Sequence, residues 1–154
     1  MKYFPVFLDA KNLSAMVIGG GEVATRKIEL LLKSTTNITI MSEQVCSSVS
    51  RLINTHQLTW LPHNYQAGHL ADITLVIAAT DNMSVNEAIY QEAVPLKILT
   101  NVVDQPTLCT YITPAIIDRS PMIIALSSSG SSPILIRMLR EQIEKTLPQA
   151  YGKL

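Results

Sequence analysis

The sequence has little of what marks several classes of protein. Its 154 residues carry 12 basic and 12 acidic side chains, so the formal net charge is zero, and only 5% are aromatic. A neutral chain lacks the long-range attraction that draws proteins to polyanions or anionic membranes, so we expect neither nucleic acid nor a membrane as partner. No apolar run reaches the roughly 20 residues that span a bilayer, and the N-terminal residues form no signal peptide. We therefore expect a cytoplasmic protein.

The sequence also lacks cysteines and histidines at the spacings that are typical of metal ligands. Cys46 and Cys109 lie far apart in the sequence, and the histidines match neither one face of a helix nor a zinc loop. We therefore expect no metal site, and we interpret both cysteines as small buried hydrophobic residues. Apolar residues, by contrast, are plentiful, because 47% of the chain is hydrophobic and the mean hydropathy is +0.25. This is enough for the core of one domain, or of one domain with a small appendage.

Short apolar runs alternate with helical patterns over the first two thirds of the chain. We expect strands at 13–18, 37–41, 58–61, 72–79 and 97–102, and helices at 22–33, 45–53 and 84–93. Neighbouring parallel strands must be joined by long crossover connections, which are usually helices. The alternation therefore predicts an α/β, Rossmann-like parallel sheet with helices on both faces over residues 1–110.

The pattern changes from residue 111 onward. Apolar runs at 111–117 and 122–126, joined by a short turn, predict an added strand pair. A last helix begins with Ser132 as N-cap and Pro133 in its first turn. One strand pair and one amphipathic helix have little core of their own. Residues 111–154 are therefore predicted to pack on a second subunit, as a homodimer.

A glycine-rich turn follows the first expected strand. Residues Gly19 to Ala24 fit the pattern Gly-x-Gly-x-x-Ala where a strand passes into a helix, the context that the dinucleotide fingerprint requires. Gly19 permits the tight turn, Gly21 lets the backbone approach a pyrophosphate, and the helix start supplies free N–H donors. Glu43 stands where this motif places an acidic residue for the ribose hydroxyls. No Arg or Lys lies within residues 41–44 to pair with a 2′-phosphate, which favours NAD over NADP.

Polar residues follow two later strands, at the edge where open α/β sheets bind ligands. Thr80 and Asp81 follow the fourth strand, and Asn101 and Val102 end the fifth, so these residues border the expected cofactor crevice. We interpret Asp81 as a helix cap rather than as a catalyst. Asp104 is the candidate for proton transfer, because a carboxylate partly shielded from water suits that role. An Asp before Gln-Pro is also a common turn former, and both interpretations stand.

A serine-rich loop precedes the last helix. Ser127–Ser132 offers hydroxyl groups and N–H groups at a helix start, which suit an anion, and Arg119, Arg137 and Arg140 are available as carboxylate clamps. The other interpretation is a flexible loop that only caps the helix. The residues leave both open.

Together these motifs resemble a known family, the N-terminal module of siroheme synthases, which is a precorrin-2 dehydrogenase. The shared stretches are VIGGGEVATRK at 17–27, IAATD at 77–81, NVVD at 101–104, IIDRSP at 116–121 and SSSGSSP at 127–133. They run in order through nearly the whole chain. The resemblance implies NAD-dependent oxidation of precorrin-2 to sirohydrochlorin, with hydride passing to the nicotinamide and a proton leaving the macrocycle. Some members of the family also insert ferrous iron into sirohydrochlorin.

The resemblance also implies roles for individual residues. The catalytic Asp of the family falls on Asp104, and its regulatory phosphoserine falls on Ser128. The cofactor contacts of the family fall on Glu22 with Val23 and on Glu43 with Gln44. A multiply carboxylated tetrapyrrole gives Ser128, Arg119 and Arg137 a ligand. Family members continue with a further helical segment over the tetrapyrrole site, which this sequence, ending at Leu154, does not include.

Two other functions are compatible with the same residues. An NAD-sensing regulatory module uses the glycine turn but oxidises nothing, and it does not need Asp104. A catalytically incomplete dimerisation fragment fits the short length. Formation of NADH from NAD and precorrin-2 separates the dehydrogenase from both.

Overall fold

The computed structural model describes residues 1–149. The chain forms two compact units: Val6–Tyr111, here the sheet unit, and Ile112–Leu154 with Met1–Pro5, here the hairpin unit. The boundary lies one residue from the predicted one, but the first five residues belong to the hairpin unit. No helix or strand precedes Ala10, so periodicity could not assign them. Residues 150–154, the end of the predicted dimerisation segment, lie outside the described residues.

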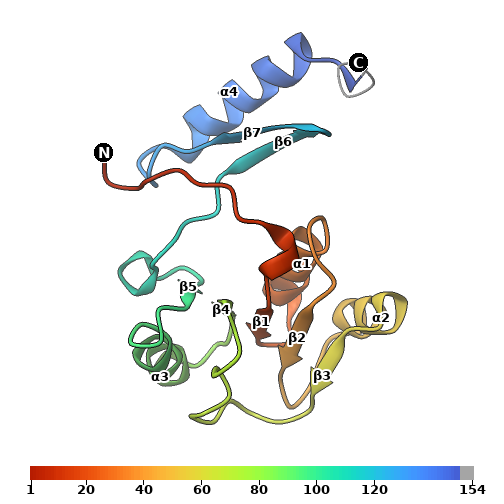
Figure 1. Cartoon of the computed structure of the whole chain (residues 1–154), viewed down its shortest axis with the longest axis vertical. Helices are drawn as coiled ribbons and strands as arrows, with labels where there is room; N and C mark the ends of the chain where they lie inside the picture. Colours follow the sequence, from red (N-terminus) through yellow and green to blue (C-terminus); the bar gives the residue numbers. More distant parts are fainter. Residues whose placement is uncertain (150–154) are drawn as a thin grey trace. The chain divides into compact units, whose positions relative to one another are not determined.

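The sheet unit is built on five parallel strands (Figure 1). These are β1 (Ala15–Ile18), β2 (Ile38–Met41), β3 (Thr59–Leu61), β4 (Leu75–Ala78) and β5 (Leu99–Val102). Their order in the sheet is β3-β2-β1-β4-β5, so β1 lies at the centre between β2 and β4. The connecting helices are α1 (Glu22–Leu31), α2 (Ser47–His56) and α3 (Met83–Ala93), with a short 3-10 turn η1 (Ala10–Asn12) before β1 and another, η2 (Pro106–Leu108), after β5. The predicted Rossmann-like α/β fold is confirmed.

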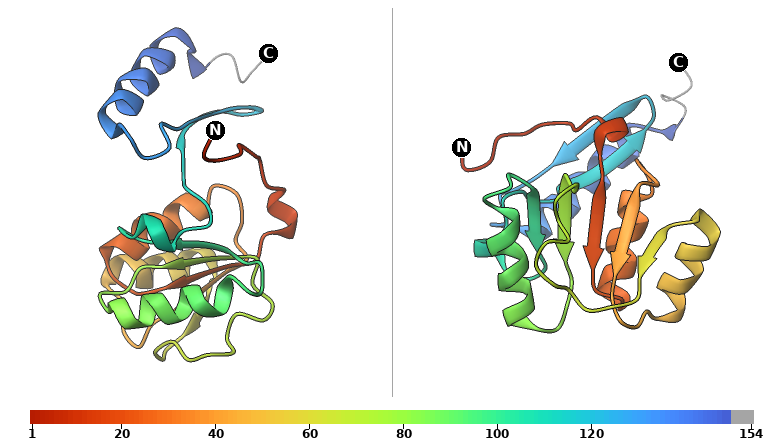
Figure 2. Two further views of the ribbon diagram at one scale, coloured as in Figure 1. Left: turned by 90° about the vertical axis from the view of Figure 1, so that its left-hand side faces the viewer. Right: turned by 60° about the horizontal axis from the view of Figure 1, so that its bottom comes forward.

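Two separate cores enclose the sheet, because successive strand residues point to opposite faces. Val17 of β1 packs with Ile28 of α1 and Val49 of α2. Ile18, the next residue, packs on the other face with Ile89 of α3. Helices α1 and α2 therefore cover one face of the sheet and α3 the other (Figure 2). All four residues of β1 are buried, which fixes the carboxyl end of this strand where the glycine turn begins.

The hairpin unit contains β6 (Ala115–Arg119), β7 (Met122–Leu126) and α4 (Pro133–Thr146). The strands pair antiparallel, as predicted, with Ile117 opposite Ile124. Ser132 caps α4 by accepting from the backbone N–H of Leu135, and Pro133 occupies the first turn, which confirms the predicted helix start. Among the described residues of this unit, Ile117 is the only buried apolar side chain.

Neither a membrane-spanning helix nor a metal cluster is found in the described part of the chain. None of its helices is long and apolar enough to cross a bilayer. Within residues 1–149, no group of three or more His, Cys, Asp or Glu side chains could hold a metal ion. Cys46 and Cys109 are free thiols, and both are half-buried rather than fully buried as expected, because each lies on a connecting segment outside the strands.

Candidate functional site

Three glycines join β1 to α1, and each has different surroundings. Gly19 has a φ of +129°, and a Cβ there would lie 2.2 Å from the carbonyl oxygen of Ala79. A Cβ on Gly20 would lie 2.2 Å from the carbonyl oxygen of Gln44. A Cβ on Gly21 would meet no described atom within 4 Å. The protein itself therefore requires Gly19 and Gly20, whereas Gly21 leaves room for a ligand to approach the backbone.

No role was predicted for Gly20, and the structure supplies one. The backbone N–H of Cys46 donates to the carbonyl oxygen of Gly20 at 2.8 Å, so the segment after β2 closes directly on the turn. The third consecutive glycine was the sequence signal. Its partners, Gln44 and Cys46, are distant in sequence, and only the fold brings them to it.

The start of α1 provides the hydrogen-bond donors of the site. Gly21 is the N-cap residue, and no side chain in the described part of the chain caps the helix. The first N–H groups of a helix have no partner inside it and carry the positive end of its dipole. Glu22 is exposed and Val23 half-buried at this end. The turn and these N–H groups together fit a pyrophosphate.

The segment after β2 holds the acidic residue predicted for the ribose. Glu43 is exposed, and its Oε2 accepts a hydrogen bond from Asn64 Nδ2 at 3.1 Å. The backbone beside it is fixed, because Ser42 Oγ donates to the carbonyl oxygen of Gln44 at 2.7 Å. Trp60 Nε1 also donates to the carbonyl oxygen of Ser42 at 3.0 Å. No described residue donates to the second carboxylate oxygen of Glu43, so this oxygen is available as an acceptor.

The turn after β4 corrects one prediction. Asn82, not Asp81, caps α3, because Asn82 Oδ1 accepts from the backbone N–H of Val85 at 3.2 Å. The helix begins at Met83, so position 82 alone places a side-chain oxygen beside its first turn. Asp81 remains exposed at the carboxyl end of β4.

A buried amide holds the same turn, and sequence reasoning gave it no role. Thr80 Oγ1 donates to Asn86 Oδ1 at 2.6 Å, and Asn86 Nδ2 donates to the carbonyl oxygen of Thr80 at 3.0 Å. Asn86 is 5% exposed and shares the buried face of α3 with Ile89 and Ala93. A polar residue at a core position of a helix was the signal that could have found it.

Asp104, the candidate base, follows the end of strand β5. Asn101 Nδ2 donates to the carbonyl oxygen of Tyr111 at 3.3 Å, and Val102 is buried in the α3-side core. Asp104 has a φ of +58°, so the chain turns away from the sheet there and the carboxylate is exposed. The expectation that the Asp104 carboxylate is partly shielded from water is therefore wrong for a single copy of the chain. Its role as a turn residue is seen directly.

Asp104 lines an open cleft of about 570 Å³ beside α1. The segment after β5 contributes Val103 and Asp104, and the α1 side contributes Val23, Arg26, Lys27, Glu29, Leu30 and Lys33. The cleft therefore joins two predicted site residues, Val23 from the start of α1 and Asp104. Glu43, Gln44, Thr80 and Asp81 do not line it.

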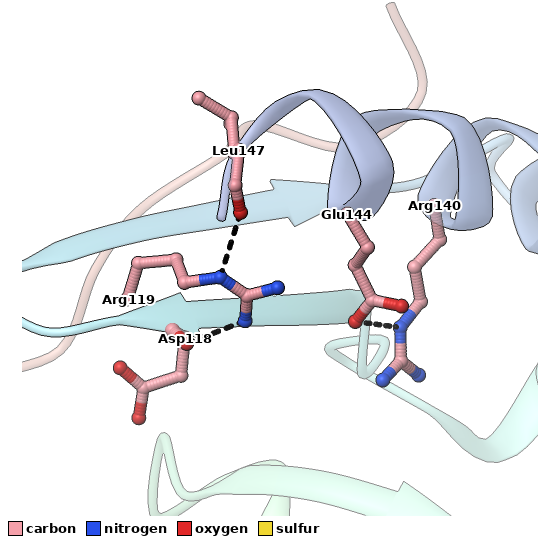
Figure 3. Close-up of polar contacts among 5 residues, drawn as sticks. All are labelled: Asp118, Arg119, Arg140, Glu144 and Leu147. Atoms are coloured by element: carbon pink, nitrogen blue, oxygen red, sulfur yellow. Dashed lines mark hydrogen bonds and ion pairs between the residues drawn. The ribbon is translucent and has the colours of Figure 1, made fainter. Parts of the chain in front are cut away.

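In the hairpin unit, two of the three candidate arginines already have partners (Figure 3). Arg119 Nε donates to the carbonyl oxygen of Leu147 at 2.9 Å, and its Nη1 donates to the carbonyl oxygen of Asp118 at 3.0 Å. The guanidinium thus ties β6 to the end of α4. Arg140 forms an ion pair with Glu144 at 3.2 Å.

The serine-rich loop is ordered by its own hydrogen bonds. Ser128 Oγ accepts from the backbone N–H of Ser132 at 3.0 Å, and the carbonyl oxygen of Ser128 accepts from Ser131 Oγ at 2.6 Å. Ser128 is half-buried in this arrangement, whereas Arg137 is exposed on α4. Their roles as substrate contacts, and the modification of Ser128, stay predictions.

Known proteins resemble this chain over all or most of its length. Residues 6–115 match a family described as putative NAD(P)-binding. The whole chain is 46% identical to siroheme synthase of Pseudoalteromonas atlantica and 43% identical to that of Nitrosospira multiformis. It covers 33% and 34% of these proteins, about a third of their length. A solved structure described as SirC, precorrin-2 dehydrogenase, is 25% identical with a TM-score of 0.82, covering 98% of this chain and 74% of that one.

These similarities agree with the geometry of the site. The resemblance to siroheme synthases that the motifs predicted is confirmed. The family match spans the glycine turn, Glu43, Thr80 and Asp104, and it confirms the nicotinamide dinucleotide as cofactor. The chain belongs to the family of putative NAD(P)-binding domains.

Proposed function

We propose that this chain is an NAD-dependent precorrin-2 dehydrogenase that forms sirohydrochlorin in siroheme biosynthesis. The observation that carries the proposal is the cleft that joins Val23, at the start of α1, with Asp104. It sets a carboxylate beside the helix end at which a dinucleotide binds. The names of the similar proteins, siroheme synthase and precorrin-2 dehydrogenase, support the same reaction.

The oxidation removes a hydride and a proton from the macrocycle. NAD, when bound, supplies the hydride acceptor. The N–H groups at the start of α1 bind its pyrophosphate, and Glu43 accepts from a ribose hydroxyl. The carboxylate of Asp104 accepts the proton. A 2′-phosphate would meet the negative charge of Glu43, which favours NAD over NADP.

We also infer that the hairpin unit pairs with a second copy of the chain. Four apolar side chains of α4 are exposed: Ile134 (74%), Leu135 (50%), Met138 (54%) and Leu139 (37%). Their spacing places them on one face of the helix. A symmetric dimer brings the same patch of two copies together, so each apolar face covers the other.

Further predictions from the sequence and from the resemblance to siroheme synthases belong to the same proposal. Arg119, Arg137 and Ser128 are proposed to contact the tetrapyrrole, and Ser128 is the proposed phosphorylation site. Insertion of ferrous iron into sirohydrochlorin is proposed as a second reaction of the module. The proposed location is the cytoplasm.

The proposed function is tested by NADH formation from NAD and freshly made precorrin-2. We expect the wild-type chain to form NADH and Asp104→Asn to be slower by roughly 100- to 10,000-fold, since the base is lost. Asn also tolerates the left-handed φ of this position, so the turn is kept. Asp72→Asn, at an exposed position of the same unit, is the matched control and keeps its rate.

Binding of NAD, measured by calorimetry, separates the other outcomes. We expect wild type and Asp104→Asn to bind NAD equally. A wild-type chain that binds NAD but forms no NADH contradicts the dehydrogenase and favours a sensing module or an incomplete fragment. An unchanged rate in Asp104→Asn contradicts Asp104 as the base while leaving the reaction itself in place.

A further inference from the structure

We propose that three cationic side chains of the cleft, Arg26, Lys27 and Lys33, bind carboxylate groups of the substrate beside Asp104. The inference rests on the proposed function, because it names an acidic macrocycle as the ligand of the same cleft. It differs from the predicted contacts of Arg119, Arg137 and Ser128, which belong to the hairpin unit.

The cleft combines an apolar surface with charges. Val23 and Leu30 lie seven residues apart on α1, two helical turns on the same face, and Val103 after β5 also lines the cleft. Arg26, Lys27 and Lys33 contribute the cationic side chains of this lining. A flat, largely apolar ring with carboxylates at its edge has the matching distribution of groups: the ring contacts the apolar side chains and the carboxylates contact the cations.

The three cations are not paired with carboxylates. Glu29 stands three residues after Arg26 on α1, a spacing at which ion pairs form across a helix, and Lys33 lies just beyond the end of α1. Yet the Arg140–Glu144 pair is the only salt bridge among the described residues. The cationic groups of the cleft are therefore available to an anionic ligand.

The charge of the cleft contrasts with that of the whole chain. The chain has no net charge, but the cleft gathers three cationic side chains against the two carboxylates of Glu29 and Asp104. Lys27 also acts on the segment after β5. Burial raises the pKa of the Cys109 thiol, and the charge of Lys27 opposes that rise. The charge of Lys27 thus reaches the Cys109 thiol, five residues after Asp104.

The test measures binding of uroporphyrin, a stable tetrapyrrole with carboxylates on all its peripheral side chains, to the full chain. The variants are Arg26→Gln, Lys27→Gln, Lys33→Gln and the three combined, and Arg51→Gln on α2 is the matched control. Loss of one partly exposed ion pair is expected to weaken binding about threefold, and loss of all three about 30-fold. Raising the salt concentration should reduce the difference in uroporphyrin affinity between wild type and the variants, because salt screens such ion pairs.

Four readouts separate a binding role from a structural one. Thermal unfolding and NAD affinity are expected to be the same in all variants, and uroporphyrin octamethyl ester, which lacks the charges, should bind all of them equally weakly. With precorrin-2, the variants should raise KM and leave kcat nearly unchanged, as loss of uniform binding does.

The outcomes for the cleft and for the reaction are distinct. Uroporphyrin binding that is absent, or that is equal in wild type and the triple variant, overturns the cleft proposal even when NADH is formed. Binding that depends on the three cations supports the cleft proposal even when precorrin-2 is not oxidised, and in that case it is the dehydrogenase that fails. A triple variant that loses NAD affinity or unfolds early marks a structural role and also overturns the proposal.

Discussion

The two units of the chain differ in how completely they bury their own apolar residues. Among the described residues, every buried apolar side chain except Ile117 lies in the sheet unit. Helices α1 and α3 each bury three residues, whereas α4, with 14 residues, buries none. A cofactor site needs a frame that holds its shape alone, and the sheet unit provides one. The hairpin unit instead presents an apolar helix face, as a surface for assembly does.

The largest expected effect comes from charging that helix face. In Leu135→Glu/Met138→Glu, dimerisation should weaken on the order of 1,000-fold, or about 4 kcal/mol, because two charges enter an apolar contact. Light scattering or analytical ultracentrifugation measures the change in mass. Arg140→Gln, an exposed substitution on the opposite side of the same helix, is the control and should leave the dimer intact. Equal masses for both variants would show that this face is not the interface.

A substitution that creates a cavity in the core of the sheet unit should have an energetic effect nearly as large. Ile28 of α1 is fully buried, so Ile28→Ala should lower the free energy of unfolding by about 2–5 kcal/mol. Ile134→Ala removes the same atoms from an exposed site on α4. At protein concentrations that keep the chain monomeric, it should change stability by less than about 0.5 kcal/mol. Urea unfolding followed by circular dichroism measures both, and similar losses would contradict the contrast between the units.

A smaller effect is expected at the carboxylate that binds a loop to α3. Glu92 accepts hydrogen bonds from the Tyr65 hydroxyl and from the backbone N–H groups of Gly68 and Leu70. Glu92→Gln should cost about 1–3 kcal/mol, since these donors lose a charged acceptor. Hydrogen exchange at Gly68 and Leu70 should accelerate. Exposed Glu87→Gln on the same helix is the control, and unchanged exchange at both amides would refute a role for Glu92.

The cap of α4 should contribute about 1 kcal/mol. Ser132→Ala removes the oxygen that accepts from the N–H of Leu135, and loss of such a cap typically costs about 0.5–2 kcal/mol. The loss should appear in the hairpin unit, as faster hydrogen exchange in the first turn of α4. Ser84→Ala, in the first turn of α3, is the control, because Asn82 rather than Ser84 caps that helix. Exchange that accelerates equally in both helices would contradict a local cap.

The last prediction concerns the pH dependence of stability that Tyr65 gives the sheet unit, a dependence that is absent at neutral pH. Burial, reinforced by Glu92, raises the pKa of Tyr65 well above its ordinary value of 10. The folded chain therefore holds this proton more tightly than the unfolded chain. Its contribution to stability is complete below pH 10 and falls as the pH rises further. Tyr65→Phe should lose less stability than wild type between neutral and strongly alkaline pH, whereas Tyr90→Phe should follow wild type.

The elements that local rules govern were predictable. Apolar runs and helical spacing located the strands and helices of the sheet unit, and Ser132-Pro133 marked the start of α4. The glycine turn, Glu43 and Asp104 followed from their places after strands. These features depend on neighbours in the sequence or on the general geometry of parallel sheets.

What sequence reasoning missed depends on contacts between distant segments. Gly20 is required by the carbonyl of Gln44, and Asn86 matters because the fold sets it against Thr80. Whether Asp81 or Asn82 caps α3 depends on the residue at which the helix begins. Hydrophobic periodicity does not locate a helix boundary to within one residue. The exposure of Asp104 likewise follows from its left-handed turn, which the residue types allow but do not dictate.

The three glycines of the turn differ in what would preserve them over evolutionary time. Replacing Gly19 or Gly20 drives a side chain into a backbone carbonyl, so selection for folding alone keeps both positions. A Cβ at position 21 would meet no described atom within 4 Å, so only a bound ligand opposes a side chain there. A lineage that stopped using the dinucleotide would therefore drift first at position 21, while its two neighbours stayed glycine. The pattern of loss among descendants would record whether the cofactor was still in use.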